Sequence, residues 1–107
     1  MNAQVELIDG PAPSGALEWL EKHLFESAGW LTAEMICQAS GERVTDRQVR
    51  ACASASDAVI SGARGYRHVE KATPEEIRHF IRDMESRAGE LQRRAVATRR
   101  RAHALIG

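Results

Sequence analysis

The stretch VTDRQVRACASASDAVISGARGYRHVEKA, residues 44–72, decides the fold that the sequence predicts. Thr45 and Asp46 are residue types that start helices, because their side-chain oxygens accept hydrogen bonds from the first backbone amides. Small and apolar residues then recur at helical spacing and form a stripe that can pack on other helices: Val49, Cys52, Ala53 and Ser56. The pattern predicts a short helix with one packed face.

The opposite face of this helix is predicted to be exposed and polar, with Arg47, Arg50, Ala51 and Ser54 on it and Gln48 beside them. A strand-like segment follows at residues 58–61, then a turn at residues 62–65 and a second alternating segment at residues 66–69. A helix that presents arginine and glutamine, followed at once by a basic hairpin, is typical of a DNA-binding surface.

Residues 16–72 resemble a winged helix-turn-helix domain of bacterial and phage DNA-binding regulators. The resemblance rests on the order of a first helix, a short strand at residues 30–32, a second helix, a third helix that opens TDRQVR, and the hairpin. It implies a mainly α fold with a small β-hairpin wing, which an extended C-terminal helix follows. It also implies sequence-specific binding of double-stranded DNA by a transcriptional or phage-type replication regulator.

Three segments are predicted along the chain: a flexible N-terminal lead-in at residues 1–14, the winged helix-turn-helix domain at residues 15–72, and a long C-terminal helix at residues 73–107. The first helix is expected over residues 14–28, from a Ser14 cap to Gly29. The second is expected over residues 33–40, capped by Thr32, with an inward face made of Met35, Ile36 and Ala39. Residues 30 and 31 are expected to pair with the edge of the hairpin.

The sequence TPEE at residues 73–76 is a helix start, with threonine at the cap, proline at the first helical position and glutamate at the third. The helix is predicted to run to Ile106, with a bend or break at Gly89. Its small and apolar residues alternate at spacings of four and three, which is a heptad seam: Ile77, Ile81, Met84, Ala88, Leu91, Ala95, Thr98, Ala102 and Leu105. The first part, with Phe80, is expected to pack on the winged domain. The part beyond Gly89 is expected to pair in a homodimer, or to fold back on its own domain.

The resemblance assigns Arg47, Gln48 and Arg50 to base edges in the major groove, where arginine pairs with guanine and glutamine with adenine. Thr45 and Ser54 are expected to contact phosphate or a base edge. The expected backbone contacts are Arg64, Arg67 and Lys71. Two alternatives stay open: Arg47 and Arg50 can simply be solvated or pair with Glu42 and Asp46, and Tyr66 is expected in the core more than on DNA.

A second basic cluster follows Glu90 with no acidic residue after it: Arg93, Arg94, Arg99, Arg100 and Arg101, with His103. It is either a phosphate-contacting tail or a solvated helix end, where cations favour the negative end of the helix dipole.

The formal net charge of zero hides an asymmetry between the two parts of the chain. Residues 1–44 carry seven acids and two bases, whereas residues 45–107 carry eight acids and thirteen bases. The basic second part favours DNA as the partner. The acidic first part and the near-neutral isoelectric point favour the alternative, a winged-helix module that binds another protein without DNA.

Other function classes find no support in the sequence. It has no phosphate-binding loop, no HExxH and no GxSxG motif, and its four histidines are dispersed, so no enzyme activity, metal site, cofactor or small-molecule ligand is predicted. No apolar run approaches the ~20 residues that span a bilayer, and no signal peptide is recognisable, which predicts a cytoplasmic protein. Cys37 and Cys52 have no CxxC spacing and are expected to be buried free thiols.

Overall fold

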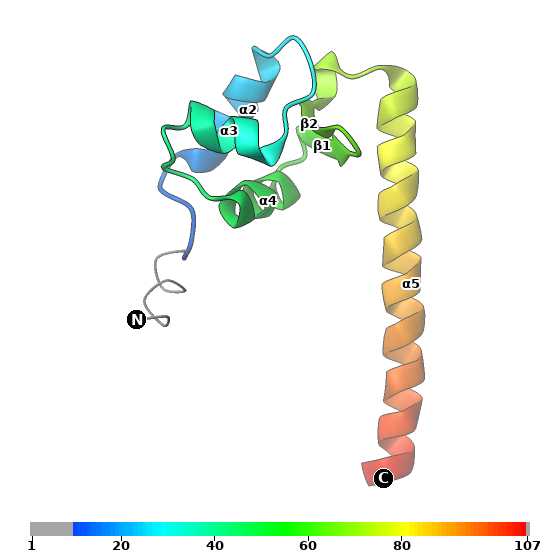
Figure 1. The fold of residues 1–107 in the computed structure, drawn as a ribbon. Helices are drawn as coiled ribbons and strands as arrows, with labels where there is room; N and C mark the ends of the chain where they lie inside the picture. Colours follow the sequence, from blue (N-terminus) through cyan, green and yellow to red (C-terminus); the bar gives the residue numbers. More distant parts are fainter. Residues whose placement is uncertain (1–9, 107) are drawn as a thin grey trace. The chain divides into compact units, whose positions relative to one another are not determined.

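The computed structural model describes residues 10–106, which are mainly helical with one small antiparallel hairpin (Figure 1). The chain divides into two compact units, Met1–Thr73 and Pro74–Gly107. The first unit contains helices α2 (Ala16–Phe25), α3 (Ala33–Ala39) and α4 (Asp46–Ala55), strands β1 (Val59–Gly62) and β2 (Gly65–His68), and a 3-10 turn, η1 (Val69–Lys71). The second unit is helix α5 (Pro74–Ile106). The predicted fold class, mainly α with a small hairpin and a long C-terminal helix, is confirmed.

The core of the first unit lies where the three short helices meet strand β1. Leu20 and Leu24 of α2 are four residues apart, so they share one helix face, and both are fully buried together with Ile36 of α3. Helix α4 contributes Val49 and Ala53, as its apolar stripe predicts, and β1 contributes Val59. Burying this face of α4 leaves the opposite face exposed.

Helix α2 is shorter than predicted at both ends. Gly15, in a left-handed conformation with φ 83°, occupies the cap, and the amide of Ala16 donates to the carbonyl of Pro13 at 3.0 Å. The predicted start at Ser14 is therefore wrong, because a turn precedes the helix. The predicted end at Gly29 is also wrong, since α2 stops at Phe25 and a local turn follows in which the Ser27 hydroxyl donates to the Gly29 carbonyl at 2.9 Å.

Helices α3 and α4 both begin at a threonine whose hydroxyl accepts a hydrogen bond from the amide three residues on. Thr32 is the cap of α3, as predicted, and Ile36 is fully buried behind it. Met35 is 49% exposed, because its sulfur turns back to accept a hydrogen bond from the Thr32 amide at 3.5 Å. The prediction that Met35 faces the core is wrong for this reason. It is wrong for Ala39 as well, which lies one turn later on the same exposed side of α3.

Strands β1 and β2 pair in register from Val59 opposite His68 to Gly62 opposite Gly65. A third short segment joins the hairpin where Leu31 bridges Tyr66, with N–O distances of 2.9 and 2.8 Å in the two directions. This confirms the predicted pairing of the segment after the first helix with the hairpin. At Gly65, where φ is 117°, an added Cβ would lie 2.3 Å from the Leu31 carbonyl oxygen, so the bridge requires glycine there.

Helix α5 begins at Pro74 and continues through Gly89 to Ile106, so the predicted bend or break at Gly89 is not present (Figure 1). At 1.5 Å per residue its 33 residues span about 50 Å. None of its described side chains is buried, and Ile81, Met84, Leu91 and Leu105 of the heptad seam are exposed. Among residues 10–106, no helix combines the length and apolar character needed to cross a bilayer.

Candidate nucleic-acid interface

The exposed face of α4 carries three of the predicted DNA-contacting residues. Arg47, Arg50 and Ser54 are all exposed, whereas Val49 and Ala53 on the other face are buried. With 3.6 residues per turn, positions i, i+3 and i+7 lie on one side of a helix. Packing of Val49 and Ala53 in the core therefore turns this side of α4 toward solvent. The structure therefore brings Arg47, Arg50 and Ser54 together on one solvent-facing surface.

Gln48 does not belong to this surface, and its predicted place beside the arginines is wrong. Its side chain is only 6% exposed. The Oε1 atom accepts a hydrogen bond from the Thr45 amide at 3.0 Å, while Nε2 donates to the carbonyls of Gly10 at 2.9 Å and Pro11 at 3.2 Å. Both ends of the amide are therefore used inside the protein, which leaves Gln48 without a group to offer an adenine.

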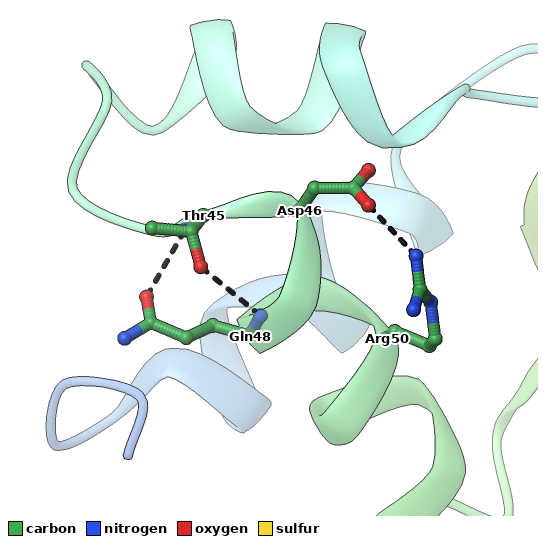
Figure 2. A network of polar contacts seen from close by, with 4 residues as sticks. All are labelled: Thr45, Asp46, Gln48 and Arg50. Carbon is green, nitrogen blue, oxygen red and sulfur yellow. Dashed lines mark hydrogen bonds and ion pairs between the residues drawn. The ribbon is translucent and has the colours of Figure 1, made fainter. Parts of the chain in front are cut away.

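Thr45 and Gln48 cap α4 reciprocally, and Figure 2 shows their side chains turned toward each other. The Thr45 hydroxyl accepts from the Gln48 amide at 3.2 Å, and Gln48 returns a bond to the Thr45 amide. This is a capping box, which satisfies two backbone donors that a helix start otherwise leaves open. The structure thus gives Thr45 a structural role, and its predicted contact with DNA stays a prediction.

Arg50 forms an ion pair with Asp46 one turn earlier on α4, at 2.9 Å between Nη2 and Oδ2 (Figure 2). This is the alternative that the sequence left open for Arg50. Both side chains remain exposed, at 67% and 62%, and exposed pairs at this spacing contribute only ~0.3–0.5 kcal/mol. The ion pair therefore holds Arg50 only weakly, and breaking it costs little free energy.

The hairpin presents its arginines around the Trp30 ring. Arg64 lies at the two-residue turn between the strands, with its guanidinium carbon 5.3 Å from the centre of the indole. Arg67 lies on β2 with its guanidinium carbon 6.0 Å from the same ring, and its Nε donates to the Lys71 carbonyl at 3.0 Å. Both distances are within cation–π range, so Trp30 is a common platform for the two cations. Arg64 is exposed at the tip, whereas Arg67 is half-buried.

Two other residues of this region, Lys71 and Tyr66, contact aromatic or apolar side chains. The Lys71 ammonium sits 4.3 Å from the centre of the Phe25 ring at the end of η1. Tyr66 is half-buried and packs against the hydrophobic core, in agreement with its expected core role. Lys71 itself is exposed, so its predicted contact with the DNA backbone stays a prediction.

The second basic cluster lies entirely on α5, and all five of its arginines are exposed: Arg93, Arg94, Arg99, Arg100 and Arg101. It belongs to a different unit from α4 and the hairpin. A contact between this cluster and phosphate stays a prediction.

The two cysteines are half-buried free thiols. Burial raises the pKa of the Cys37 thiol, and the carboxylates of Asp46, Glu42 and Glu34 raise it further. Burial and then Glu18 raise the pKa of Cys52 in the same way. Within residues 10–106 no group of three or more histidine, cysteine or acidic side chains is placed to hold a metal ion.

Sequence reasoning missed the structural role of Gln48, although the signal is present. The order Thr45-x-x-Gln48 has the S/T-x-x-E/Q spacing of a capping box. The two bonds from Gln48 to Gly10 and Pro11 had no such signal, because these residues lie 38 and 37 positions earlier in the chain.

Comparison of the chain with models of known protein families, with curated proteins and with solved structures gives no match.

Proposed function

We propose that the protein binds double-stranded DNA with sequence specificity, as a homodimeric regulator of transcription or of phage-type replication. Helix α4 enters the major groove and the hairpin contacts the flanking backbone, in the manner of the winged helix-turn-helix regulators that residues 16–72 resemble. The observation that supports this proposal most is the exposed face of α4, where Arg47, Arg50 and Ser54 lie together. Such a regulator of bacterial or phage genes acts in the cytoplasm.

Arg47 and Arg50 are the proposed base-reading residues, because a guanidinium can bind the O6 and N7 acceptors of guanine with two hydrogen bonds. Gln48 is no longer included, since its amide is used within the protein. Arg64 at the hairpin turn is proposed to bind phosphate, with its orientation supported by Trp30. Specificity then depends on two arginines, with Ser54 as a further polar contact.

The proposed homodimer forms through α5. Its seam residues Ile81, Met84, Leu91 and Leu105 are exposed in a single chain, and a second copy would remove them from water. Two recognition helices bound to two half-sites would increase affinity and specificity together.

A second candidate function is a winged-helix module that binds another protein without DNA. A specific observation favours it: Gln48 and Arg50, both predicted to read bases, already form contacts with other groups of the protein. The acidic first part of the chain, with seven acids and two bases in residues 1–44, also repels phosphate.

Titration of the protein against random-sequence duplex DNA at several salt concentrations tests the proposal. If the protein neutralises about five phosphates, log affinity falls against log salt with a slope of about −4 to −5. Arg64→Ala lowers the magnitude of this slope by about one, because one phosphate contact is lost. Lys22→Ala removes an exposed cation of α2 outside the proposed surface and leaves the slope unchanged. Binding that is undetectable at low salt, or insensitive to salt, favours the protein-binding module instead.

A further inference from the structure

Bulky side chains are concentrated in the first half of the α5 seam and small ones in the second, with Ala88 and Leu105 as exceptions. The first half of the seam contains Ile77, Ile81, Met84 and Ala88, whereas the second half contains Ala95, Thr98, Ala102 and Leu105. Leu91 lies between the two groups and is 67% exposed. The seam is continuous, because α5 is helical from Pro74 to Ile106.

This separation distinguishes the two directions in which a pair of α5 helices can pack. In a parallel pair, each seam residue would pack in one layer with the same residue of the other helix. Bulky side chains would then hold the two helices apart in the first half, and alanines would leave gaps between them in the second half. Antiparallel helices would place the bulky half of each against the small half of the other. With the axis near Leu91, Met84 then faces Thr98 and Ile81 faces Ala102, so these layers combine a large and a smaller side chain. The remaining layers pair like with like: Ala88 with Ala95, Ile77 with Leu105, and Leu91 with itself.

The charge of α5 has the same asymmetry. Residues 74–90 carry five acidic side chains and three arginines, whereas residues 91–106 carry five arginines and no acid. Parallel packing would place the two groups of five arginines side by side, within the ~8–10 Å over which charges interact at ordinary salt. Antiparallel packing places each arginine-rich half beside a half with net negative charge.

The seam is also complementary to itself. A twofold axis across the middle of α5, near Leu91, relates the two copies. The first half of each helix then packs against the second half of the other, and the two contacts are equivalent. An interface of this isologous kind is the usual one in homodimers. The opposite net charges of the two halves, together with the Met84/Thr98 and Ile81/Ala102 layers, favour a second copy of the chain as the partner.

We propose that α5 pairs with α5 of a second copy of the chain in the antiparallel direction. The proposal deepens the homodimer part of the proposed function and does not depend on DNA binding. It places the two Pro74 residues at opposite ends of a helix pair about 50 Å long. The two units that precede Pro74 are then attached at opposite ends of the pair.

Distances between spin labels on the full chain in solution test the direction of packing. Cys37→Ala and Cys52→Ala remove the native thiols, and a label is then attached at Glu90→Cys, Ala97→Cys or Ala104→Cys in separate proteins. These three positions are exposed and seven residues apart, so they occupy equivalent places around the seam. The antiparallel pair predicts a short distance at residue 90 and axial separations of about 20 Å at residue 97 and about 40 Å at residue 104. Equal short distances at all three positions show parallel packing and overturn the proposal.

Two charge substitutions in the otherwise natural chain give a second measurement that needs no label. Leu91→Glu places a carboxylate in the middle of the seam, and it is expected to convert the dimer to a monomer in sedimentation. Val96→Glu is the matched control: Val96 is also an exposed apolar residue of α5, 44% exposed, but lies off the seam, so the dimer is expected to persist. A natural chain that sediments as a monomer at high concentration overturns the pairing itself, whether or not the protein binds DNA.

Discussion

The side chain of Gln48 joins the start of α4 to the backbone of Gly10, 38 residues earlier in the chain, with 2.9 Å between Nε2 and the carbonyl oxygen. The same amide caps α4 through its oxygen, so one side chain fixes both the helix start and the segment that precedes α2. That segment was predicted to be a flexible lead-in over residues 1–14. Residues 1–9 lie outside the described part of the chain, whereas Gly10 and Pro11 are held by hydrogen bonds.

Gln48→Ala is expected to lower the free energy of unfolding by about 1–3 kcal/mol, because it removes a capping bond and two further hydrogen bonds at a buried position. Urea denaturation measures the change. Gln48→Glu keeps the capping oxygen but places a carboxylate against the Gly10 and Pro11 carbonyls at a buried position, so it should destabilise the protein at least as much as Gln48→Ala. A preference among DNA sequences that disappears in Gln48→Ala, with stability unchanged, would restore a base-reading role.

Gly65→Ala is expected to destabilise the first unit by about 2 kcal/mol or more, since alanine disfavours positive φ and its Cβ would collide with the Leu31 carbonyl. Gly62→Ala is the matched substitution on the facing strand. An added Cβ there meets the Trp30 ring at 3.7 Å, an ordinary contact, so stability should change little. Thermal unfolding of both variants checks the difference, and equal melting temperatures would mean that the bridge between Leu31 and Tyr66 is not needed.

Asp46→Asn is expected to increase affinity for random duplex DNA several-fold at low salt. It removes a negative charge from α4 and releases Arg50 from its ion pair. The cost in stability should stay below about 1 kcal/mol, because the pair is exposed and the lost favourable interaction with the helix dipole is small. Unchanged affinity measured by fluorescence anisotropy would indicate that this face of α4 does not approach DNA.

Arg47→Ala and Arg64→Ala are expected to differ in the kind of binding that they reduce. Arg47→Ala should mainly reduce the preference for the selected site over random DNA, by about 1–3 kcal/mol, because it removes a base contact. Arg64→Ala should weaken binding to all sequences to a similar extent, because it removes a phosphate contact. Selection of bound oligonucleotides from a random pool supplies the site. The proposed division of roles fails if both variants lose sequence preference equally.

Cys37 and Cys52 are expected to react slowly with alkylating reagents at pH 8 in the folded protein. Burial raises the pKa of both thiols, so less of the reactive thiolate is present than in the unfolded chain. Because the folded state holds the thiol protons more tightly, these thiols favour the folded state below the ordinary thiol pKa. This contribution to the free energy of unfolding is lost as the pH rises through the raised pKa. Reaction rates in buffer and in urea test this, and equal rates would contradict it.

The prediction of the hairpin and of its bridge to the segment after α2 shows how far local patterns reach. Glycines at residues 62 and 65 mark the turn, and alternating residues mark the strands, so the hairpin was visible in the sequence. Thr32 and Thr45 likewise identified the starts of two helices. The ends of α2 were missed, because a glycine cap and a serine turn depend on backbone angles that composition does not specify.

The sequence by itself determined the mainly α fold, the hairpin, the buried stripe of α4 and the length of α5, because each depends on side chains close together in the chain. The tertiary structure decided which polar side chains remain available. Gln48 was lost from the candidate surface because the carbonyls of Gly10 and Pro11, far away in sequence, lie within reach of its amide. Helical periodicity places a residue on a face, but only the folded chain determines what covers that face.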